Sequence, residues 1–458
     1  MDIKRRLDDF AHSYIYIGLI GIISLIFWYT RNQKIAYYCI TFFLVLTPLL
    51  SKDAKTILAV APFAMSCYQG FVNMSEMPFE MIITIIGLAL SVIIYLVRNI
   101  KHIKVKFNGS IISYSLLLLA LGCFIATVIR HIFYNQPAFP NSGYETVYNI
   151  KYGYLLSLIV LAMALFSLFI SSCNDLKHQA FFSKVFFVFG LYLFTQLVIA
   201  VITKKSFDFK EIYPFIAWCE KNSMAIAIEM CLPFIACLYS KNFKRIDLLC
   251  LMAGLLFFVI TGGSRGGQVT TIFMMPLLLY IVLHQTKHKY RNFITIMLLI
   301  GFIGFLSYFN IPIVKVNIDR LILKGLDVTG RDIFWKWIFD YTYNDHRHLL
   351  FGGSPVFLIE INSLFNKTFV INPWLCHNTF MTCLAAGGTF GLLAIVYHFI
   401  ESFVGIIRRG GLDKIAILTF TFVGLVHGMI DNTFFYILYM IPYIIILSTI
   451  NKPWNKVM

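Results

Sequence analysis

Long apolar runs recur along almost the whole chain of 458 residues, and only short polar stretches separate most of them. A helix that crosses a membrane needs about 20 consecutive, mostly apolar residues, whereas a soluble domain has no use for so many runs of this kind. Hydrophobic residues make up 59% of the chain and charged residues 13%, and the mean hydropathy is +0.78. We therefore predict an all-α integral membrane protein, a polytopic bundle of about 12–14 transmembrane helices with one long periplasmic segment.

The apolar runs predict three consecutive parts of the chain. About eleven spans fall within an N-terminal transmembrane bundle at 1–310, a long periplasmic segment follows at 311–374, and the remaining transmembrane helices fall within 375–458. Residues 1–9 enter the first run without a small-residue cleavage site, so we expect the first helix to be retained. The runs lie near 12–29, 35–50, 56–72, 79–97, 111–129, 150–171, 183–203, 223–240, 248–262, 268–284, 293–310, 375–403, 415–430 and 433–449.

The distribution of basic residues predicts how the chain is oriented. Short basic clusters near 4–6, 52–55, 98–106, 177–184, 241–245, 287–291, 408–414 and 452–456 fall on one side of the predicted membrane. The positive-inside rule places that side, with both termini, in the cytoplasm and the segment 311–374 on the outer side of the membrane. The net charge of +16 is thus explained by orientation signals and contacts with anionic membrane lipids, and we expect no nucleic-acid partner.

Cofactor motifs are missing from the sequence. There is no phosphate-binding loop, dinucleotide fingerprint, HExxH motif or paired-cysteine metal site, so we expect neither a cofactor nor a metal. Most of the ten cysteines fall inside apolar runs and are interpreted as packing residues. Cys219 and Cys376 both fall near the predicted outer surface, where a disulfide between them is an alternative to two free thiols.

A glycine-rich motif, GGSRGG, occupies 262–267 at the outer end of two apolar runs. Its glycines allow a ligand to approach the backbone closely, and the Arg265 guanidinium suits a phosphate group, with Ser264 and Gly266 beside it. The simpler alternative is a glycine-rich turn with an interfacial arginine.

Two further motifs lie on the predicted outer side. The stretch TGRDIFWKW at 329–337 predicts a short helix that Thr329 caps, with Trp335 at the membrane interface, and Arg331 is either solvated or a second cation for a diphosphate. The stretch CHNTF at 376–380 begins a span in which His377, followed by Asn378, is either a general base or an ordinary cap residue. The small residues of GGTFG at 387–391 would let neighbouring helices approach closely.

A last polar turn, HGMIDN, is expected at 427–432 between the final two spans. Its Asp431 and Asn432 either orient a substrate or simply end the helix, and the turn interpretation is the favoured one.

The order GGSRGG, TGRDIFW, HNTF and GGTFG resembles the O-antigen ligase and O-antigen polymerase superfamily of bacterial inner-membrane glycosyltransferases over roughly 250–445. The resemblance implies a metal-independent, inverting transferase of lipopolysaccharide biosynthesis whose donor is a glycan on undecaprenyl diphosphate. It also implies that Arg265 and Arg331 bind the diphosphate and that His377 is the catalytic base. The supporting residues are then Ser264, Gly266, Asn378 and Trp335.

The identity of the acceptor distinguishes a ligase from a polymerase. A ligase transfers the glycan to a lipid A-core acceptor, whereas a polymerase transfers it to a second lipid-linked glycan, and the order Arg, Arg, His favours the ligase. A polysaccharide flippase or another secondary transporter is the third alternative. Against transport, the charges gather in the predicted outer segments, not along a pathway through the membrane midplane, and no pair of matching interrupted spans is visible.

Overall fold

The computed structural model describes residues 3–68, 79–100, 111–133, 150–173, 180–212, 216, 221–284, 289–324, 331–366, 377–408 and 413–448. Within these ranges the regular elements are all helices, and no strand occurs among them. The N-terminal half contains α1 (Ile3–Ala11), α2 (Tyr14–Tyr29), α3 (Gln33–Leu50), the 3₁₀ helix η1 (Ala54–Ala59), α4 (Ala61–Tyr68), α5 (Phe79–Asn99), α6 (Ile111–Phe133), α7 (Ile150–Cys173), α8 (Phe181–Lys204), α9 (Phe209–Ile212) and α10 (Lys221–Lys241).

The C-terminal half continues with α11 (Ile246–Thr261), α12 (Arg265–Leu283), α13 (Lys289–Asn310), α14 (Pro312–Lys324), α15 (Arg331–Tyr343), α16 (His346–Leu349), α17 (Ser354–Asn366) and α18 (Thr379–Ile407). It ends with α19 (Asp413–Phe422), the π-helical turn η4 (Val423–His427), α20 (Gly428–Ile430), the 3₁₀ turn η5 (Thr433–Phe435) and α21 (Ile437–Ser448). In its described part, each predicted apolar run lies on one or more of these helices.

The chain is an all-α polytopic membrane protein. Seven helices in the described ranges are long and apolar enough to cross a membrane, namely α5, α6, α7, α8, α10, α12 and α18. The pair α1 and α2, bent by 49°, forms an eighth candidate. The expected total of about 12–14 full spans is larger because several apolar runs fold as shorter or broken helices; the run near 56–72, for instance, divides into η1 and α4.

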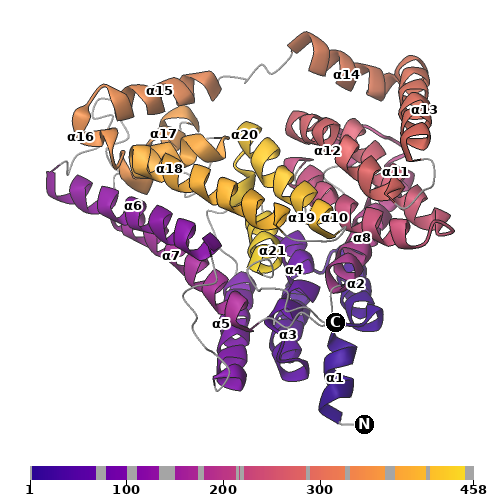
Figure 1. Cartoon of the computed structure of the whole chain (residues 1–458), viewed down its shortest axis with the longest axis horizontal. Helices are drawn as coiled ribbons and strands as arrows, with labels where there is room; N and C mark the ends of the chain where they lie inside the picture. The colour runs from indigo at the N-terminus through magenta and orange to yellow at the C-terminus, as the bar shows by residue number, and fades with distance from the viewer. Residues whose placement is uncertain are drawn as a thin grey trace.

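One hydrophobic core joins the two ends of the chain. The most buried of the candidate spans is α10, with 89% of its apolar 18-residue window buried, and α8, α11, α12 and α19 pack around it. The last helix, α21, contacts α4 and α7, so the C-terminal helices lie among the N-terminal ones (Figure 1). Helices from 1–310 and from 375–458 therefore contribute to the same hydrophobic core.

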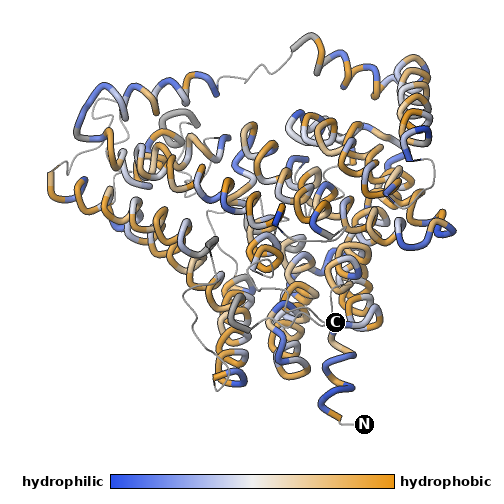
Figure 2. Tube along the Cα trace, in the orientation of Figure 1, coloured by the Kyte–Doolittle hydropathy of each residue, from blue (hydrophilic) through white to orange (hydrophobic). Residues whose placement is uncertain are grey.

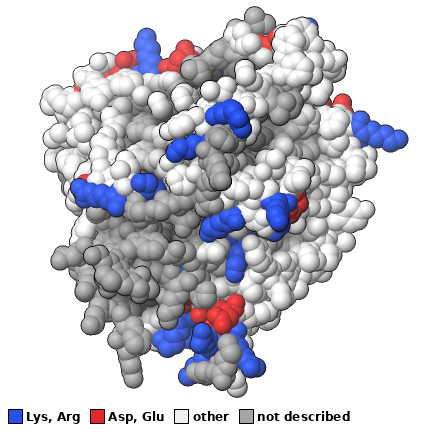
Figure 3. All heavy atoms as spheres, turned by 45° about the vertical axis from the view of Figure 1, so that its right-hand side comes forward, with Lys and Arg blue, Asp and Glu red and all other residues white. Residues whose placement is uncertain are grey.

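Hydrophilic segments lie at opposite ends of the molecule. Figure 2 shows α1 as a largely hydrophilic helix at the lower end, and hydrophilic residues along α14 and α15 at the upper edge. On the face that Figure 3 presents, most of the described surface is uncharged, and Lys and Arg side chains form separate groups at its top, middle and bottom. Large uncharged areas are expected where lipid surrounds a protein.

The segment predicted as one long outer loop, 311–374, is largely helical where the structure describes it, because α14 to α17 occupy most of it. A buried ion pair fixes α17 to the end of α6. Arg130 donates from Nη2 to both carboxylate oxygens of Glu360, at 2.7 and 2.8 Å, and from Nη1 to the carbonyl of Gly353 at 2.7 Å. Thr329, the predicted cap of the next helix, lies outside the described residues, and α15 begins at Arg331.

The GGTFG motif breaks α18 in the middle. Gly388 has φ of +61° and ψ of −154°, a conformation that is costly for a residue with a side chain. The turn before α17 fills the break, since the N–H of Gly353 donates to Ala385 and the N–H of Phe390 donates to Leu350, both at 3.0 Å. The small residues thus allow a loop, not only a helix, to approach α18 closely.

Candidate functional site

The candidate site is centred on Asp431, in the turn between α20 and η5. Its carboxylate is almost fully buried and accepts hydrogen bonds from His377 Nδ1 at 3.1 Å, the Tyr436 hydroxyl at 2.9 Å and the N–H of Asn432 at 2.9 Å on one oxygen. The other oxygen accepts from Asn222 Nδ2 at 2.8 Å. Four donors from four different residues therefore surround one carboxylate.

These hydrogen bonds keep Asp431 ionised although it is buried. Burial by itself raises the pKa of the carboxyl, but the hydrogen bond and charge of His377, with the charges of His427 and Arg331, outweigh that effect and lower the pKa to about 2. The residue lies between the apolar helices Lys414–Ile430 and Leu438–Ser448 and belongs to neither. At neutral pH it is a fixed anion at the end of the helical bundle.

The start of α18 is pinned to the turn that carries Asp431. Asn378 caps the helix, because its Oδ1 accepts from the N–H groups of Phe380 and Met381 at 2.9 and 3.1 Å. Its own N–H donates to Asn432 Oδ1 at 2.9 Å, and its Nδ2 donates to the Met429 carbonyl at 3.0 Å. These hydrogen bonds of Asn378 thus fix the position of the neighbouring His377.

The backbone of His377 is held in the left-handed region, with φ of +50°. Such values are uncommon for residues other than glycine, and histidine is one of those that adopt them more often. The side chain is 28% exposed, and its Nδ1 faces Asp431. One ring nitrogen is therefore committed to the buried carboxylate while the ring retains access from outside.

A relay of two hydrogen bonds connects the glycine-rich motif to the same carboxylate. Ser264 is the N-cap of α12 and accepts from the N–H of Gly267 at 3.2 Å. Its hydroxyl donates to Asn222 Oδ1 at 3.0 Å, and the amide group of Asn222 donates to Asp431. The first turn of α12, which begins at Arg265, is therefore held beside Asp431.

Arg331 reaches the site from the first turn of α15. Its Nη1 donates to the carbonyl of Ile430, the residue directly before Asp431. Burial lowers the pKa of Arg331, the Asp431 carboxylate raises it, and the charge of Arg265 lowers it again. Arg331 is therefore within electrostatic range of both Asp431 and Arg265. Figure 1 shows the corresponding helices, α12, α15, α18 and α20, in the upper half of the molecule, away from α1.

A second buried pair lies directly behind this site. Glu229 of α10 and His427 of η4 are fully buried, and Nδ1 of His427 is 3.0 Å from Oε2 of Glu229. The other ring nitrogen of His427 faces Gly266, where an added Cβ would lie only 2.6 Å from it. Gly266 is therefore needed for the close packing of α12 against His427, a role different from the ligand approach predicted for it.

The structure thus brings together most of the residues that the sequence motifs singled out. His377 and Arg331 lie beside Asp431, and Arg265 is close enough to Arg331 to lower its pKa. Ser264 and Asn378 occupy hydrogen-bonded supporting positions. A further predicted residue, Trp335, packs partly buried against the hydrophobic core.

Three residues of the site were not predicted. Asn222 and Tyr436 carry no recognisable sequence pattern, because each is an ordinary polar residue near a helix end. Glu229 did carry a pattern: it is an acidic residue in the middle of an apolar run, which is a typical mark of a functional or paired residue in a membrane span.

Among the residues that the structure describes, no group of three or more His, Cys, Asp or Glu side chains is arranged to hold a metal ion. Cys219 and Cys376, the predicted alternative disulfide, lie outside the described residues. Comparison of the chain with protein-family models, curated proteins and solved structures finds no match.

Proposed function

We propose that the protein is an O-antigen ligase-like glycosyltransferase of the bacterial inner membrane, which moves a glycan from undecaprenyl diphosphate to a lipid A-core acceptor at the periplasmic face. The observation that carries this proposal is the grouping of His377 and Arg331 at Asp431, with Arg265 close to Arg331. The three residues come from three separate motifs whose order along the chain resembles this superfamily.

The charges of the site suit an anionic donor. The guanidiniums of Arg265 and Arg331 are close enough to act on each other electrostatically, and Asp431 acts on Arg331. Two neighbouring guanidiniums would stabilise the diphosphate, whose negative charge grows as the glycosyl bond breaks. Arginine suits this role because its planar fork can bind two phosphate oxygens at once.

His377 supplies the base. With Nδ1–H donating to Asp431, the tautomer leaves the lone pair on Nε2, which accepts the proton of the acceptor hydroxyl. The hydroxyl oxygen forms a bond to the anomeric carbon while the bond from that carbon to the diphosphate oxygen breaks. The proton stays on Nε2, undecaprenyl diphosphate leaves as the anion, and the in-line attack inverts the anomeric configuration.

A polymerase that joins lipid-linked repeats would use the same donor residues, so it is the second candidate. A polysaccharide flippase is a weaker alternative, because transport needs no histidine held by a carboxylate at one end of the bundle. The partners in either enzyme are the lipid-linked donor, a lipid A-core or second lipid-linked glycan, and membrane lipids.

The experiment combines purified protein in nanodiscs with an undecaprenyl-diphosphate-linked glycan and lipid A-core, and measures glycan transfer by gel shift and mass spectrometry. Wild-type protein is expected to form the product, and His377→Ala to reduce the rate about 10²- to 10⁴-fold, the usual contribution of a general base. His346→Ala, which removes a histidine that is 92% exposed and lies outside the site, is the matched control and should retain most activity. Equal rates for wild type and His377→Ala would refute the role of the base.

The glycan found on lipid A-core in a host strain that lacks the protein distinguishes a ligase from a polymerase. Lipid A-core without any glycan supports a ligase, whereas lipid A-core with a single repeat supports a polymerase. Accumulation of donor on the cytoplasmic side, with no transfer by purified protein, would instead support a flippase.

A further inference from the structure

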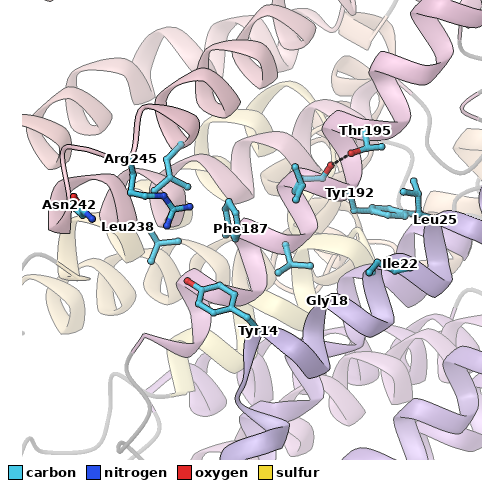
Figure 4. A pocket seen from close by; sticks show the side chains of 14 residues that line it. Tyr14, Gly18, Ile22, Leu25, Phe187, Tyr192, Thr195, Leu238, Asn242 and Arg245 are labelled. Carbon is cyan, nitrogen blue, oxygen red and sulfur yellow. Dashed lines mark hydrogen bonds between the residues drawn. The ribbon is translucent and has the colours of Figure 1, made fainter.

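An apolar groove runs along the exposed side of α2 and α8, and its polar residues lie at the end of α11 opposite to Arg265 (Figure 4). It has a volume of about 520 Å³, and its walls come from α2, α8, the end of α10 and the start of α11. At its rim, Ile22 and Leu191 are 59% and 45% exposed. Gly18 leaves the groove open, because a Cβ added there would meet nothing within 4 Å.

Polar groups gather at one end of this groove. Figure 4 shows Tyr14, Asn242 and Arg245 there, with Thr195 and Leu25 at the other end. The connection from α10 to α11 carries Asn242 and Arg245, and both side chains are exposed. The arrangement is that of an amphipathic ligand with an apolar tail and a polar head.

Three hydrogen-bond donors at the polar end have no partner among the described residues. Arg245 binds Asp247 through Nε and Nη2, at 2.6 to 3.0 Å, which leaves Nη1 unused. Asn242 Oδ1 accepts from the N–H of Lys244, which fixes the orientation of the amide and leaves Nδ2 unused. The hydroxyl of Tyr14 makes no hydrogen bond in the described part of the chain.

The charge at this end is basic. Besides Arg245, whose charge Asp247 partly balances, Lys184 lies over the ring of Tyr14 at 5.4 Å, and Lys244 is exposed in the same connection. Basic side chains at the edge of a membrane attract anionic lipid headgroups.

We propose that this groove is a binding site for an anionic phospholipid. One acyl chain lies along Gly18 and Leu191 between α2 and α8, and the phosphate accepts hydrogen bonds from Arg245 Nη1, Asn242 Nδ2 and the Tyr14 hydroxyl. The inference is independent of the proposed glycosyl transfer.

The position of the groove makes it unlike a binding site for the diphosphate of the glycan donor, because its polar end lies far from Arg265. Arg245 directly precedes α11, and the motif with Arg265 follows its other end. A helix of 16 residues is about 24 Å long, so α11 separates the two groups of cations by most of the thickness of a membrane.

The test counts phospholipids that remain bound to purified protein by native mass spectrometry, with phosphatidylglycerol as the probe and phosphatidylcholine as the zwitterionic comparison. Gly18→Leu should fill the groove and weaken phosphatidylglycerol binding at least tenfold. Gly301→Leu is the matched control, because Gly301 of α13 also has nothing within 4 Å and lies outside the groove. Arg245→Gln should weaken phosphatidylglycerol more than phosphatidylcholine.

Unchanged binding in both Gly18→Leu and Arg245→Gln would overturn the proposal. It would also be overturned if undecaprenyl phosphate displaced phosphatidylglycerol at equal or lower concentration, since the groove would then hold a polyprenyl chain. Both variants should retain glycan transfer if the candidate site is correct, so the failure of one proposal can be recognised apart from the failure of the other.

Discussion

The imidazole Nδ1 of His377 lies 3.1 Å from Oδ1 of Asp431, although 54 residues separate them in the chain. Asp431 is buried, while His377 keeps a part of its surface exposed. The contact couples the start of α18 to the turn before α21, and it assigns each ring nitrogen of the histidine a different environment. In the proposed transfer reaction, the role of His377 as a base therefore depends on the Asp431 carboxylate.

Asp431→Asn tests that dependence. The amide preserves the shape of the side chain but removes the anion that holds the Nδ1–H tautomer, so we expect glycan transfer to fall at least 10²-fold. The protein should still insert, and the donor should still bind through the two arginines. Transfer measured in nanodiscs at saturating donor checks the prediction, and a rate within threefold of wild type would contradict it.

The lowered pKa of Asp431 predicts how the stability of the protein depends on pH. This pKa is about 2 in the folded protein, below the ordinary value of an aspartate, so ionised Asp431 favours folding above pH 4 and this contribution disappears as the pH falls toward 2. A shift of this size corresponds to about 2 kcal/mol. Thermal unfolding in detergent between pH 2 and 7 should therefore show a steeper loss for wild type than for Asp431→Asn. Asp247→Asn, at a fully exposed position, should follow the wild-type curve closely.

Arg331→Lys tests whether the proposed donor site needs the planar guanidinium of Arg331 or only its positive charge. Lysine preserves the positive charge but loses the fork that can bind two phosphate oxygens, and it loses the present hydrogen bond to Ile430. We expect a KM for the lipid-linked donor about 10- to 100-fold higher, the value of one strong charged hydrogen bond. Lys336→Arg, an exposed position on the same helix, should leave the KM unchanged.

The sequence predicted the helical class and the candidate cations because both depend on local patterns. Apolar runs of sufficient length predict helices, and arginine among glycines suggests an anion site whatever the rest of the chain does. In contrast, the role of Asp431 depends on Asn222, which is 209 residues away. Hydrogen bonds over such separations leave no local pattern, so Asp431 was interpreted chiefly as a turn residue.

The break in α18 could not be predicted from the sequence either. Glycines at 387 and 388 indicated close packing, but only the loop at 350–353 decides whether such glycines stay helical or break the helix. The same holds for η1 and α4, where an apolar run looked long enough for a span and tertiary packing divided it. The apolar pattern of a segment predicts that it is buried. Whether its backbone stays helical or breaks depends on the segments that pack against it.

Gly266→Ala tests the packing of the glycine-rich motif. In an isolated helix the change would favour folding, but here the added methyl group would lie 2.6 Å from Nε2 of His427. We expect the protein to lose about 1–3 kcal/mol of stability, the usual cost of overpacking, as a lower midpoint of thermal unfolding in detergent. Gly301→Ala, where nothing lies within 4 Å, should leave stability equal or slightly higher. A Gly266→Ala protein as stable as wild type would show that His427 can move away.

The ion pair between Arg130 and Glu360 gives the last prediction, which concerns the attachment of α17 to the bundle. Both side chains are buried, and Arg130 also donates to the Gly353 carbonyl beside the break in α18. Arg130→Met leaves the Glu360 carboxylate buried without its guanidinium, which costs about 3–5 kcal/mol in comparable pairs. The double variant Arg130→Met/Glu360→Met removes both charges and should be more stable than Arg130→Met alone, because no unpaired charge stays buried. Thermal unfolding of wild type, both single variants and the double variant measures the coupling between the two residues. Strictly additive losses would mean that the pair contributes through packing alone and that α17 is attached by its apolar contacts.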